Sequence, residues 1–393
     1  MSGPHKRFLT WVTVCFAVTL LPIFILNMLL LDSTLGNTHK VLLASQWQQE
    51  TRGVTYAPTL SDTHLFKTLR LNDRLHDIDT VILGSSTALG ITAAMFPDEL
   101  RAYNFAQTGH DLSSVIDEAE FLLRHQPSLK SLVIPLDWSI SFIYQPDSPA
   151  EIDLSATANS GSAEPNPVPW LSRAADALSY PRIASLMDIL NSSVHARHPW
   201  RTFAGYFNNG GGDDYTCPDG TPAKDFDIVH RGTCTGFRYD GSATFASSSR
   251  VNDARALIAS ATASNSKYYQ NLTAQQGLPN AALLLRLADL ADLARQHHVQ
   301  LILFLPPLLP DMEQEFMRHP LLSPYLDNTK RTLNAWADDH HLFLFDAGQS
   351  ERFSCSSDEF LDEHHAVASC YAKVFKALWQ AYHVHQISSH IPK

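Results

Sequence analysis

Short apolar runs alternate with amphipathic stretches in two parts of the chain. An apolar run that ends at Gly or Pro is typical of a buried strand, whereas apolar residues three and four positions apart are typical of a helix. Because strands and helices alternate, the pattern predicts an α/β fold, a three-layer sandwich with a mostly parallel central sheet. The expected strands are residues 79–84, 102–106, 129–136, 299–305 and 342–346, and the expected helices are residues 87–100, 112–125, 279–298, 322–340 and 366–383.

The most apolar part of the chain lies near its N-terminus, where residues 8–31 carry no charged side chain. A helix rises about 1.5 Å per residue, so this stretch is long enough to cross a hydrocarbon core of about 30 Å. Lys6 and Arg7 precede it and Asp32 follows it, which places the N-terminus in the cytoplasm by the positive-inside rule. We therefore expect a single-pass membrane anchor. A cleaved signal peptide is the alternative, but the apolar run exceeds the usual length and no small-x-small cleavage site follows.

Composition changes between the two alternating parts. Ser, Ala, Pro and Asn dominate residues 148–169, and Asn, Gly and Asp form a turn at residues 208–214. Aromatic residues in this region fit either a small core or a surface that stacks on sugar rings. The expected segments are a cytoplasmic N-terminus (1–7), a transmembrane anchor (8–31), a stalk (32–78), a first domain part (79–145), an inserted cap (146–275) and a second domain part (276–393).

Composition and charge narrow the class of protein. The chain of 393 residues is 45% hydrophobic and 18% charged, a profile typical of packed globular proteins. Its formal net charge is -11, and no long run of Lys or Arg is present. Binding to nucleic acid requires positive charge that neutralises phosphates, so we expect no nucleic-acid partner.

Cysteine spacing is informative about the outer part of the chain. Cys15 lies in the expected anchor, and the other four fall into two local pairs, Cys217 with Cys234 and Cys355 with Cys370. An even number in an oxidising compartment favours disulfides, and local pairing is the simplest of the three connectivities. Free buried thiols and a zinc site are the alternatives. The zinc site lacks the C-x-x-C or H-x-x-x-H spacing that it requires, so we expect no metal.

Ser86 stands where an open α/β sheet places reactive groups, just past the first expected strand and at the start of an expected helix. The helix dipole and free N–H groups at that point favour a developing oxyanion. A serine hydroxyl needs a histidine as base and a carboxylate that orients the histidine. Asp362 and His365 stand three residues apart on a loop before the last expected helix, and such a loop can return to the end of the first strand.

Three short motifs in this order resemble the SGNH/GDSL hydrolase superfamily, particularly its membrane-anchored bacterial members. They are V-I-L-G-S-S-T at 81–87, Y-N-F-A-Q-T-G at 103–109 and D-E-H-H at 362–365. The resemblance covers about residues 79–145 and 279–385. It implies Ser86 as nucleophile, His365 as base and Asp362 as the orienting carboxylate. It also implies that the backbone N–H groups of Ser86 and Gly109 form an oxyanion hole.

The chain departs from the family in the third block, where Asp137 stands in place of the usual Asn. An ionised aspartate cannot donate a hydrogen bond, so the oxyanion hole would rest on backbone donors. Losing one donor typically costs about 2.7 to 4 kcal/mol of transition-state stabilisation.

Each candidate also has a structural interpretation. Ser86 fits a helix N-cap, Asp362 fits a cap of the last helix, and His365 fits a surface histidine. The rivals are His364 as base, Asp358 and Glu363 as orienting carboxylates, and His110 and Asp137 as pocket-lining or partly buried structural residues.

Two functions follow from these residues and from the resemblance. The first is a serine esterase or O-acyltransferase that acts on acyl, chiefly acetyl, esters of cell-surface glycans in the periplasm and needs no cofactor. The second is a catalytically degenerate scaffold or binding subunit of a surface-polysaccharide assembly system. Expected partners are an acylated glycan or other ester substrate, the membrane through the N-terminal helix, and polysaccharide-assembly proteins.

Overall fold

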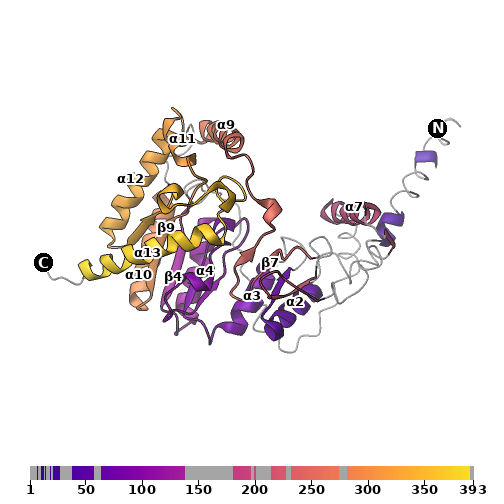
Figure 1. The fold of residues 1–393 in the computed structure, drawn as a ribbon, viewed down its shortest axis with the longest axis horizontal. Coiled ribbons are helices and arrows are strands. Elements are labelled where there is room, and N and C mark those ends of the chain that lie inside the picture. Colours follow the sequence, from indigo (N-terminus) through magenta and orange to yellow (C-terminus); the bar gives the residue numbers. More distant parts are fainter. Residues whose placement is uncertain are drawn as a thin grey trace. The chain divides into compact units, whose positions relative to one another are not determined.

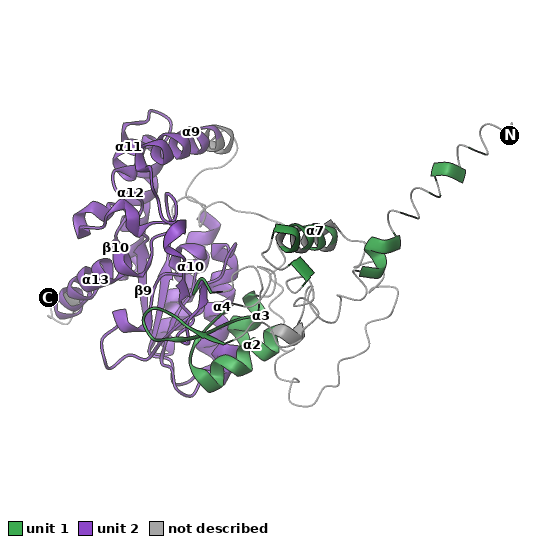
Figure 2. Ribbon diagram, turned by 45° about the vertical axis from the view of Figure 1, so that its right-hand side comes forward, with its two compact units in different colours: residues 1–69, 153–234 green, residues 70–152, 235–393 purple. Residues whose placement is uncertain are grey.

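The computed structural model describes residues 38–56, 63–137, 180–195, 199–200, 214–226, 232–273 and 281–389, with scattered residues between 7 and 26. The chain forms two compact units, each built from two separate stretches of sequence (Figure 2). Unit 1 comprises Met1–Leu69 and Asp153–Cys234, and unit 2 comprises Arg70–Ile152 and Thr235–Lys393.

Unit 2 is built on a parallel sheet of five strands, which confirms the predicted α/β class with a mostly parallel sheet. Strands from both halves of the chain lie side by side, with β4 next to β9 (Figure 1). All carboxyl ends therefore meet at one edge, as in other open α/β sheets. In spatial order the strands are β10 (Phe343–Asp346), β9 (Gln300–Leu305), β4 (Ser131–Pro135), β2 (Thr80–Ile82) and β3 (Ala102–Asn104).

Alternate residues of these strands pack against helices on one face of the sheet. Val81, Leu132 and Leu303 share a buried core with residues of α4 (Leu112–His125) and α10 (Ala281–Gln296). Leu333 of α12 (Ser323–Asp339) extends the same core. The bounds of α4 are those predicted from its sequence, because Asp111 caps its first turn by accepting a hydrogen bond from the Ser114 N–H at 2.8 Å.

The opposite face of the sheet is covered by α13 (Ala368–Ser389). Phe304 of β9 contacts the rings of Tyr371 and Phe375, with centroids 6.5 and 5.7 Å away. Phe343 of β10 contacts the ring of Tyr382 at 5.1 Å. Strand residues therefore alternate between two helical layers, as expected for a parallel sheet that is buried on both faces.

The helix predicted after Ser86 is wrong. Residues 86–100 contain only two short 3₁₀ turns, η2 (Ser86–Ala88) and η3 (Ala93–Met95). Tertiary hydrogen bonds replace those of a helix here. The buried Asn104 amide donates to the carbonyls of Ala88 and Ile91, at 2.8 Å each. The Asp240 carboxylate accepts from the Ala93 N–H at 2.7 Å. Local propensity is overridden because these backbone groups have partners elsewhere in unit 2.

Other elements of unit 2 lie outside the predicted pattern. Strands β7 and β8 form an antiparallel pair, and a long helix, α9, precedes the second part of the sheet. The remaining elements are β7 (Gly236–Phe237), β8 (Ala243–Thr244), η5 (Ser247–Ser249), α9 (Ala254–Thr273), α11 (Met312–Arg318), η6 (Ser350–Phe353) and η7 (Ser357–Glu359); helix α3 (Thr63–Arg74) crosses from unit 1 into unit 2.

The described part of unit 1 contains short strands and a small buried cluster. Strand β1 (Val54–Tyr56) pairs in parallel with β6 (Pro222–Asp225), which pairs antiparallel with β5 (Tyr215–Thr216). Its helices are α2 (Thr38–Thr51) and α7 (Tyr180–His195). Val54, Cys217 and Ala223 form a buried cluster, and the predicted Cys217–Cys234 disulfide is confirmed.

The boundaries of these units differ from the predicted domains. The segment interpreted as a stalk contributes β1, which pairs with β6 of the predicted insertion. The insertion itself is divided, because residues after Cys234 belong to unit 2. A change in composition marks where a segment begins along the chain, but pairing between remote strands has no local signature.

The predicted anchor at residues 8–31 lies largely outside the described residues. Within the part of the chain that the structure describes, no helix combines the length and apolar character needed to cross a membrane. The single-pass anchor stays a prediction.

Candidate functional site

Ser86 lies just beyond the carboxyl end of β2, in a tight turn. Gly84 has a φ of 134°, and a Cβ atom there would lie 2.5 Å from Cγ of Pro135, so only glycine fits this close approach to β4. The Ser85 hydroxyl caps η2 by accepting from the Thr87 N–H, so Ser86 itself is not the cap. The Ser86 side chain is thereby left available for other contacts and is partly exposed.

The structure brings together the three residues that the sequence predicts as a catalytic set. Nε2 of His365 lies 2.7 Å from Oγ of Ser86. Nδ1 of the same ring lies 2.6 Å from Oδ2 of Asp362. Both ring nitrogens are therefore engaged in hydrogen bonds that run from Ser86 through His365 to Asp362. This is the geometry of a nucleophile, its base and the group that orients the base.

Asp362 is held as an anion by its neighbours. Its Oδ1 accepts hydrogen bonds from the backbone N–H groups of His364 and His365 at 3.0 and 2.9 Å. Burial acts to raise the pKa of Asp362, but the hydrogen bond and charge of His365 and the charge of His364 hold that pKa well below its usual range. An ionised Asp362 accepts from Nδ1–H of His365, so Nε2 can receive a proton from Ser86.

The loop that carries Asp362 and His365 is tied together by its backbone. The Leu361 N–H donates to the His365 carbonyl, and the Val367 N–H donates to the Glu359 carbonyl, each at 2.9 Å. The predicted Cys355–Cys370 disulfide is confirmed and encloses the loop, with its Cα atoms 5.2 Å apart. These links restrict the loop on both sides of the histidine.

Two further contacts fix this loop and the start of α13 against the segment that carries Ser86. The Tyr371 hydroxyl donates to the Thr87 carbonyl at 2.5 Å. A Cβ atom on Gly90 would lie 2.6 Å from the Ala366 carbonyl oxygen, so glycine is required for the two segments to pack this closely. The sequence offers little signal for either contact, because both residues join segments that are far apart in the chain.

Gly109 lies in the loop after β3, at the same edge of the sheet as Ser86. Its φ of 78° is in the region that favours glycine, and a Cβ atom there would meet nothing within 4 Å. Among the described residues no hydrogen bond joins Gly109 to Ser86. Its role in an oxyanion hole stays a prediction.

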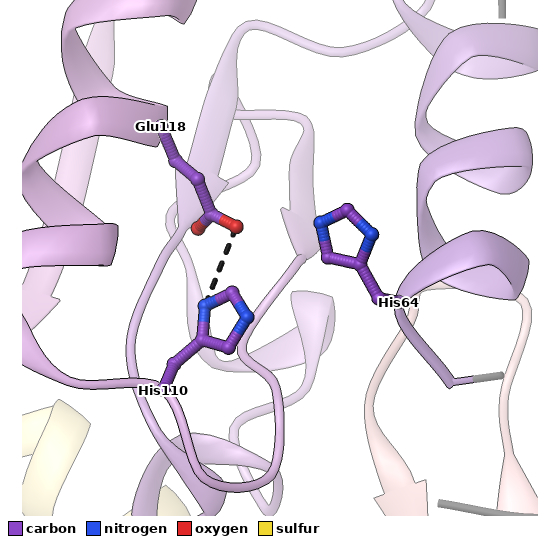
Figure 3. Close-up of side chains that lie close together, drawn as sticks. All are labelled: His64, His110 and Glu118. Carbon is purple, nitrogen blue, oxygen red and sulfur yellow. Dashed lines mark ion pairs between the residues drawn. The ribbon is translucent and has the colours of Figure 1, made fainter. Parts of the chain in front are cut away.

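His110, next to Gly109, pairs with a buried carboxylate on α4. Its Nδ1 lies 3.3 Å from Oε1 of Glu118, the ion pair that is dashed in Figure 3. The Gln107 amide donates to the same oxygen at 3.3 Å. These contacts anchor the loop after β3 to α4, which is a structural role.

His364, the rival base, faces carboxylates instead of Ser86. Its Nδ1 lies 3.4 Å from Oε1 of Glu363 and 3.8 Å from Oδ1 of Asp362. Burial acts to lower the pKa of His364, but the hydrogen bond to Glu363 and the negative charges of Asp137, Asp362 and Glu363 raise it to about 9. His364 is therefore a cation at neutral pH and a poor proton acceptor.

The rival carboxylates are also separated from the base. Glu363 is bonded to His364, and Asp358 lies in η7, where its main partner is Ser356. Asp137 is buried directly after β4, where its charge acts on His364 and Tyr371. The carboxylate that contacts His365 is Asp362.

A metal ion is the remaining alternative for this cluster. Asp362, His364 and His365 each offer a ligand atom, and these atoms lie within 4.8 Å of one another. An ion bound by His365 would have to take a ring nitrogen that is already hydrogen-bonded to Ser86 or Asp362. The geometry favours the hydrogen-bonded arrangement.

No protein-family model matches this chain, and a search of the curated proteins finds no match. Functional assignment therefore depends on the chemistry of the site.

Proposed function

We propose that this protein is a serine esterase or O-acyltransferase in which Ser86 is the nucleophile, His365 the general base and Asp362 the group that orients it. The observation that supports the proposal is the pair of hydrogen bonds on the two nitrogens of His365, at 2.7 Å to Ser86 and 2.6 Å to Asp362. Ser86 is remote in sequence from Asp362 and His365, which lie on an irregular loop. Formation of the fold does not by itself require these three side chains to align.

The proposed reaction follows from the positions of these atoms. Oγ of Ser86 attacks the ester carbonyl carbon while Nε2 of His365 accepts its proton. The imidazolium is stabilised by the Asp362 carboxylate and then gives the proton to the departing alcohol oxygen. An acyl-enzyme remains on Ser86. Water or a sugar hydroxyl then attacks the acyl group, with His365 again accepting a proton, and Ser86 is regenerated.

Backbone N–H groups would stabilise the oxyanion in this scheme. Ser86 opens a 3₁₀ turn of three residues instead of a helix, so the dipole expected from a long helix is weak here. The proposed donors are the N–H groups of Ser86 and Gly109. Asp137 cannot donate while it is ionised, so we expect a slower reaction than one in which a third donor is present.

The SGNH/GDSL resemblance extends the proposal to the substrate and the cellular setting. The substrate would be an acetyl or similar short acyl ester on a cell-surface glycan. Residues 8–31 would anchor the protein in the cytoplasmic membrane, with the catalytic domain in the periplasm. Proteins of polysaccharide assembly would be its partners. The alternative is a scaffold that keeps the fold without the activity, and Asp137 in place of the family's Asn favours it.

Labelling with a fluorophosphonate probe separates these two functions. The full-length protein, purified in mild detergent, is incubated with the probe beside Ser86→Ala and His365→Ala. Matched controls are Ser128→Ala and His297→Ala, which remove an exposed serine and an exposed histidine at the other edge of the sheet. Mass spectrometry locates the labelled residue.

We expect wild type and both controls to be labelled on Ser86, and both site variants to remain unlabelled. Labelling that persists in EDTA separates the serine mechanism from a metal-dependent one. A folded wild type that is not labelled would overturn the enzyme proposal and favour the scaffold.

A further inference from the structure

Tyr371 is a fully buried side chain that the proposed reaction does not use. It lies in the first turn of α13, directly after Cys370. Burial raises the pKa of its hydroxyl far above the usual value, so the group keeps its proton and remains a hydrogen-bond donor. The hydroxyl donates to the Thr87 carbonyl at 2.5 Å. Thr87 directly follows the proposed nucleophile, so a donor from α13 reaches the turn that presents Ser86.

This contact takes the place of one that a helix would make. In an α-helix over residues 87–100, the Thr87 carbonyl would accept from the Ile91 N–H. The Ile91 N–H instead donates to the Ala88 carbonyl at 3.0 Å, in the tight turn that follows η2. The short turn therefore leaves the Thr87 carbonyl to a donor from another element, and the Tyr371 hydroxyl is that donor.

The ring of Tyr371 is packed on several sides, so its hydroxyl has little freedom. Its centroid lies 6.5 Å from that of Phe304 on β9 and 6.2 Å from that of Phe375 on α13. A Cβ atom on Gly90 would lie 3.1 Å from Cδ2 of the same ring. Because packing already places the ring, loss of the hydroxyl alone keeps the core filled and removes only the link to the turn.

The backbone of Tyr371 is tied to the loop of the proposed base. The Tyr371 N–H donates to the Val367 carbonyl at 3.1 Å, and the Val367 N–H donates to the Glu359 carbonyl at 2.9 Å. These two bonds join the first turn of α13 to both ends of the loop that carries His365. Tyr371 thus contacts the framework of the base through its backbone and the turn of Ser86 through its hydroxyl.

We propose that Tyr371 is a positioning residue, whose hydroxyl holds the turn of Ser86 at the distance from His365 that proton transfer requires. The inference rests on the proposed function, since it concerns the same nucleophile and base. Oγ of Ser86 and Nε2 of His365 lie 2.7 Å apart. Proton transfer needs these atoms about 2.6 to 3.2 Å apart, so a small displacement of the turn is enough to prevent it.

Tyr371→Phe tests this inference by the removal of one oxygen atom. The rate of fluorophosphonate labelling of the full-length protein is measured against probe concentration, which separates the maximal labelling rate from the half-saturating concentration. A misplacement of about 1 Å can cost about 100-fold in rate, so we expect the maximal rate to fall by about 10- to 100-fold. The half-saturating concentration should change little, because the variant keeps the ring and the groups around the probe.

Trp379→Phe is the matched control. Trp379 lies further along α13, and its Nε1–H donates to the Met95 carbonyl of η3 at 2.9 Å. The variant removes a bond of the same kind, from the same helix to the next 3₁₀ turn, and should keep the maximal rate of wild type. A loss of stability alone would lower the fraction of protein that can be labelled in both variants, without slowing Tyr371→Phe in particular. Equal maximal rates in Tyr371→Phe and wild type, or equal losses in the two variants, would overturn the inference.

Crystal structures of wild type and Tyr371→Phe keep this result separate from the proposed function. The distance between Oγ of Ser86 and Nε2 of His365 should exceed about 3.2 Å in the variant and stay within hydrogen-bond reach in wild type. If wild type is not labelled, the enzyme proposal fails, but a longer distance in the variant would still support the positioning role of Tyr371. An equal distance in both proteins would refute that role, whether or not the serine reacts.

Discussion

The two disulfides close loops of similar length, with sequence separations of 17 and 15, but in very different surroundings. In unit 1 the Cys217–Cys234 bridge lies among short strands of two to four residues. Cys217 is itself part of the small buried cluster with Val54 and Ala223. This cluster of described residues buries little apolar surface, so we expect the covalent link to contribute a large share of the local stability.

Unit 2, which contains the Cys355–Cys370 bridge, has a large apolar core. Cys370 is fully buried in the first turn of α13, next to the buried Tyr371. The loop between the cysteines carries Asp362 and His365. The sheet has an extensive buried core of its own, so we expect the bridge chiefly to limit where the loop can move. The same type of bond therefore supports the fold in one unit and the position of the loop with His365 in the other.

The largest effect should come from Asp362→Asn, inside the Cys355–Cys370 loop. An amide cannot hold His365 in the tautomer that accepts the Ser86 proton, and the corresponding change in serine proteases costs about 10⁴-fold. We expect the rate of fluorophosphonate labelling to fall by about 10³- to 10⁴-fold with little change in thermal stability. Asp358→Asn, in the same loop but without contact to His365, is the control. Equal losses in both variants would mean that loop integrity, and not Asp362, sets the rate.

Replacing both Cys355 and Cys370 by serine should reduce activity and stability together. Opening a loop of this size removes about 3 kcal/mol by the chain-entropy model. A displacement of His365 by about 1 Å is expected to slow labelling by up to about 100-fold. Urea unfolding and the labelling rate are the measurements. A labelling rate equal to that of wild type would show that the backbone hydrogen bonds of the loop suffice.

The matched change, Cys217→Ser with Cys234→Ser, should separate the two units. We expect a loss of about 2 to 4 kcal/mol in the stability of unit 1, seen as faster amide exchange in β1 and β6. Labelling of Ser86 should stay within about twofold of wild type, because Ser86 and His365 both belong to unit 2. If the labelling rate instead falls as far as in the other disulfide variant, the contrast between the two bridges is wrong.

The smallest effect concerns His364 and pH. Its pKa is raised from 6.5 to about 9 in the folded protein, so its contribution to stability is fully present below pH 6.5 and lost as pH rises through 9. Relative to His364→Gln, wild type should lose about 1 to 3 kcal/mol of unfolding free energy between pH 6 and 9.5. Urea titrations of both proteins at the two pH values measure this difference. Parallel losses in the two proteins would count against a charged His364.

Predictions from local pattern succeeded where an element depends on its own residues. The five strands of the parallel sheet are short apolar runs, and α4 has both its cap, Asp111, and a clear apolar face, so both were found from sequence. The disulfides were also predictable because each pair is close in sequence. The proximity of Ser86 to Asp362 and His365 was predictable because parallel topology sends the ends of remote strands to one edge.

Where the prediction failed, remote contacts outweighed local preference. Residues 86–100 have an apolar pattern compatible with a helix, yet Asn104 and Asp240 bind backbone groups that a helix would use. The segment interpreted as a stalk supplies β1 because its partner, β6, comes from the middle of the chain. Neither partner is visible in a local window of sequence.

The sequence by itself determined the alternation of strands and helices, the cysteine pairs and the types of residue available for catalysis, since these depend on neighbours along the chain. The tertiary structure decided which of the two adjacent histidines contacts Ser86. His364 and His365 are adjacent and chemically identical, but one ring faces Glu363 and Asp362 and the other bridges Ser86 and Asp362. That difference arises because the loop packs against the segment that carries Ser86 and Gly90, which sets the direction of each ring.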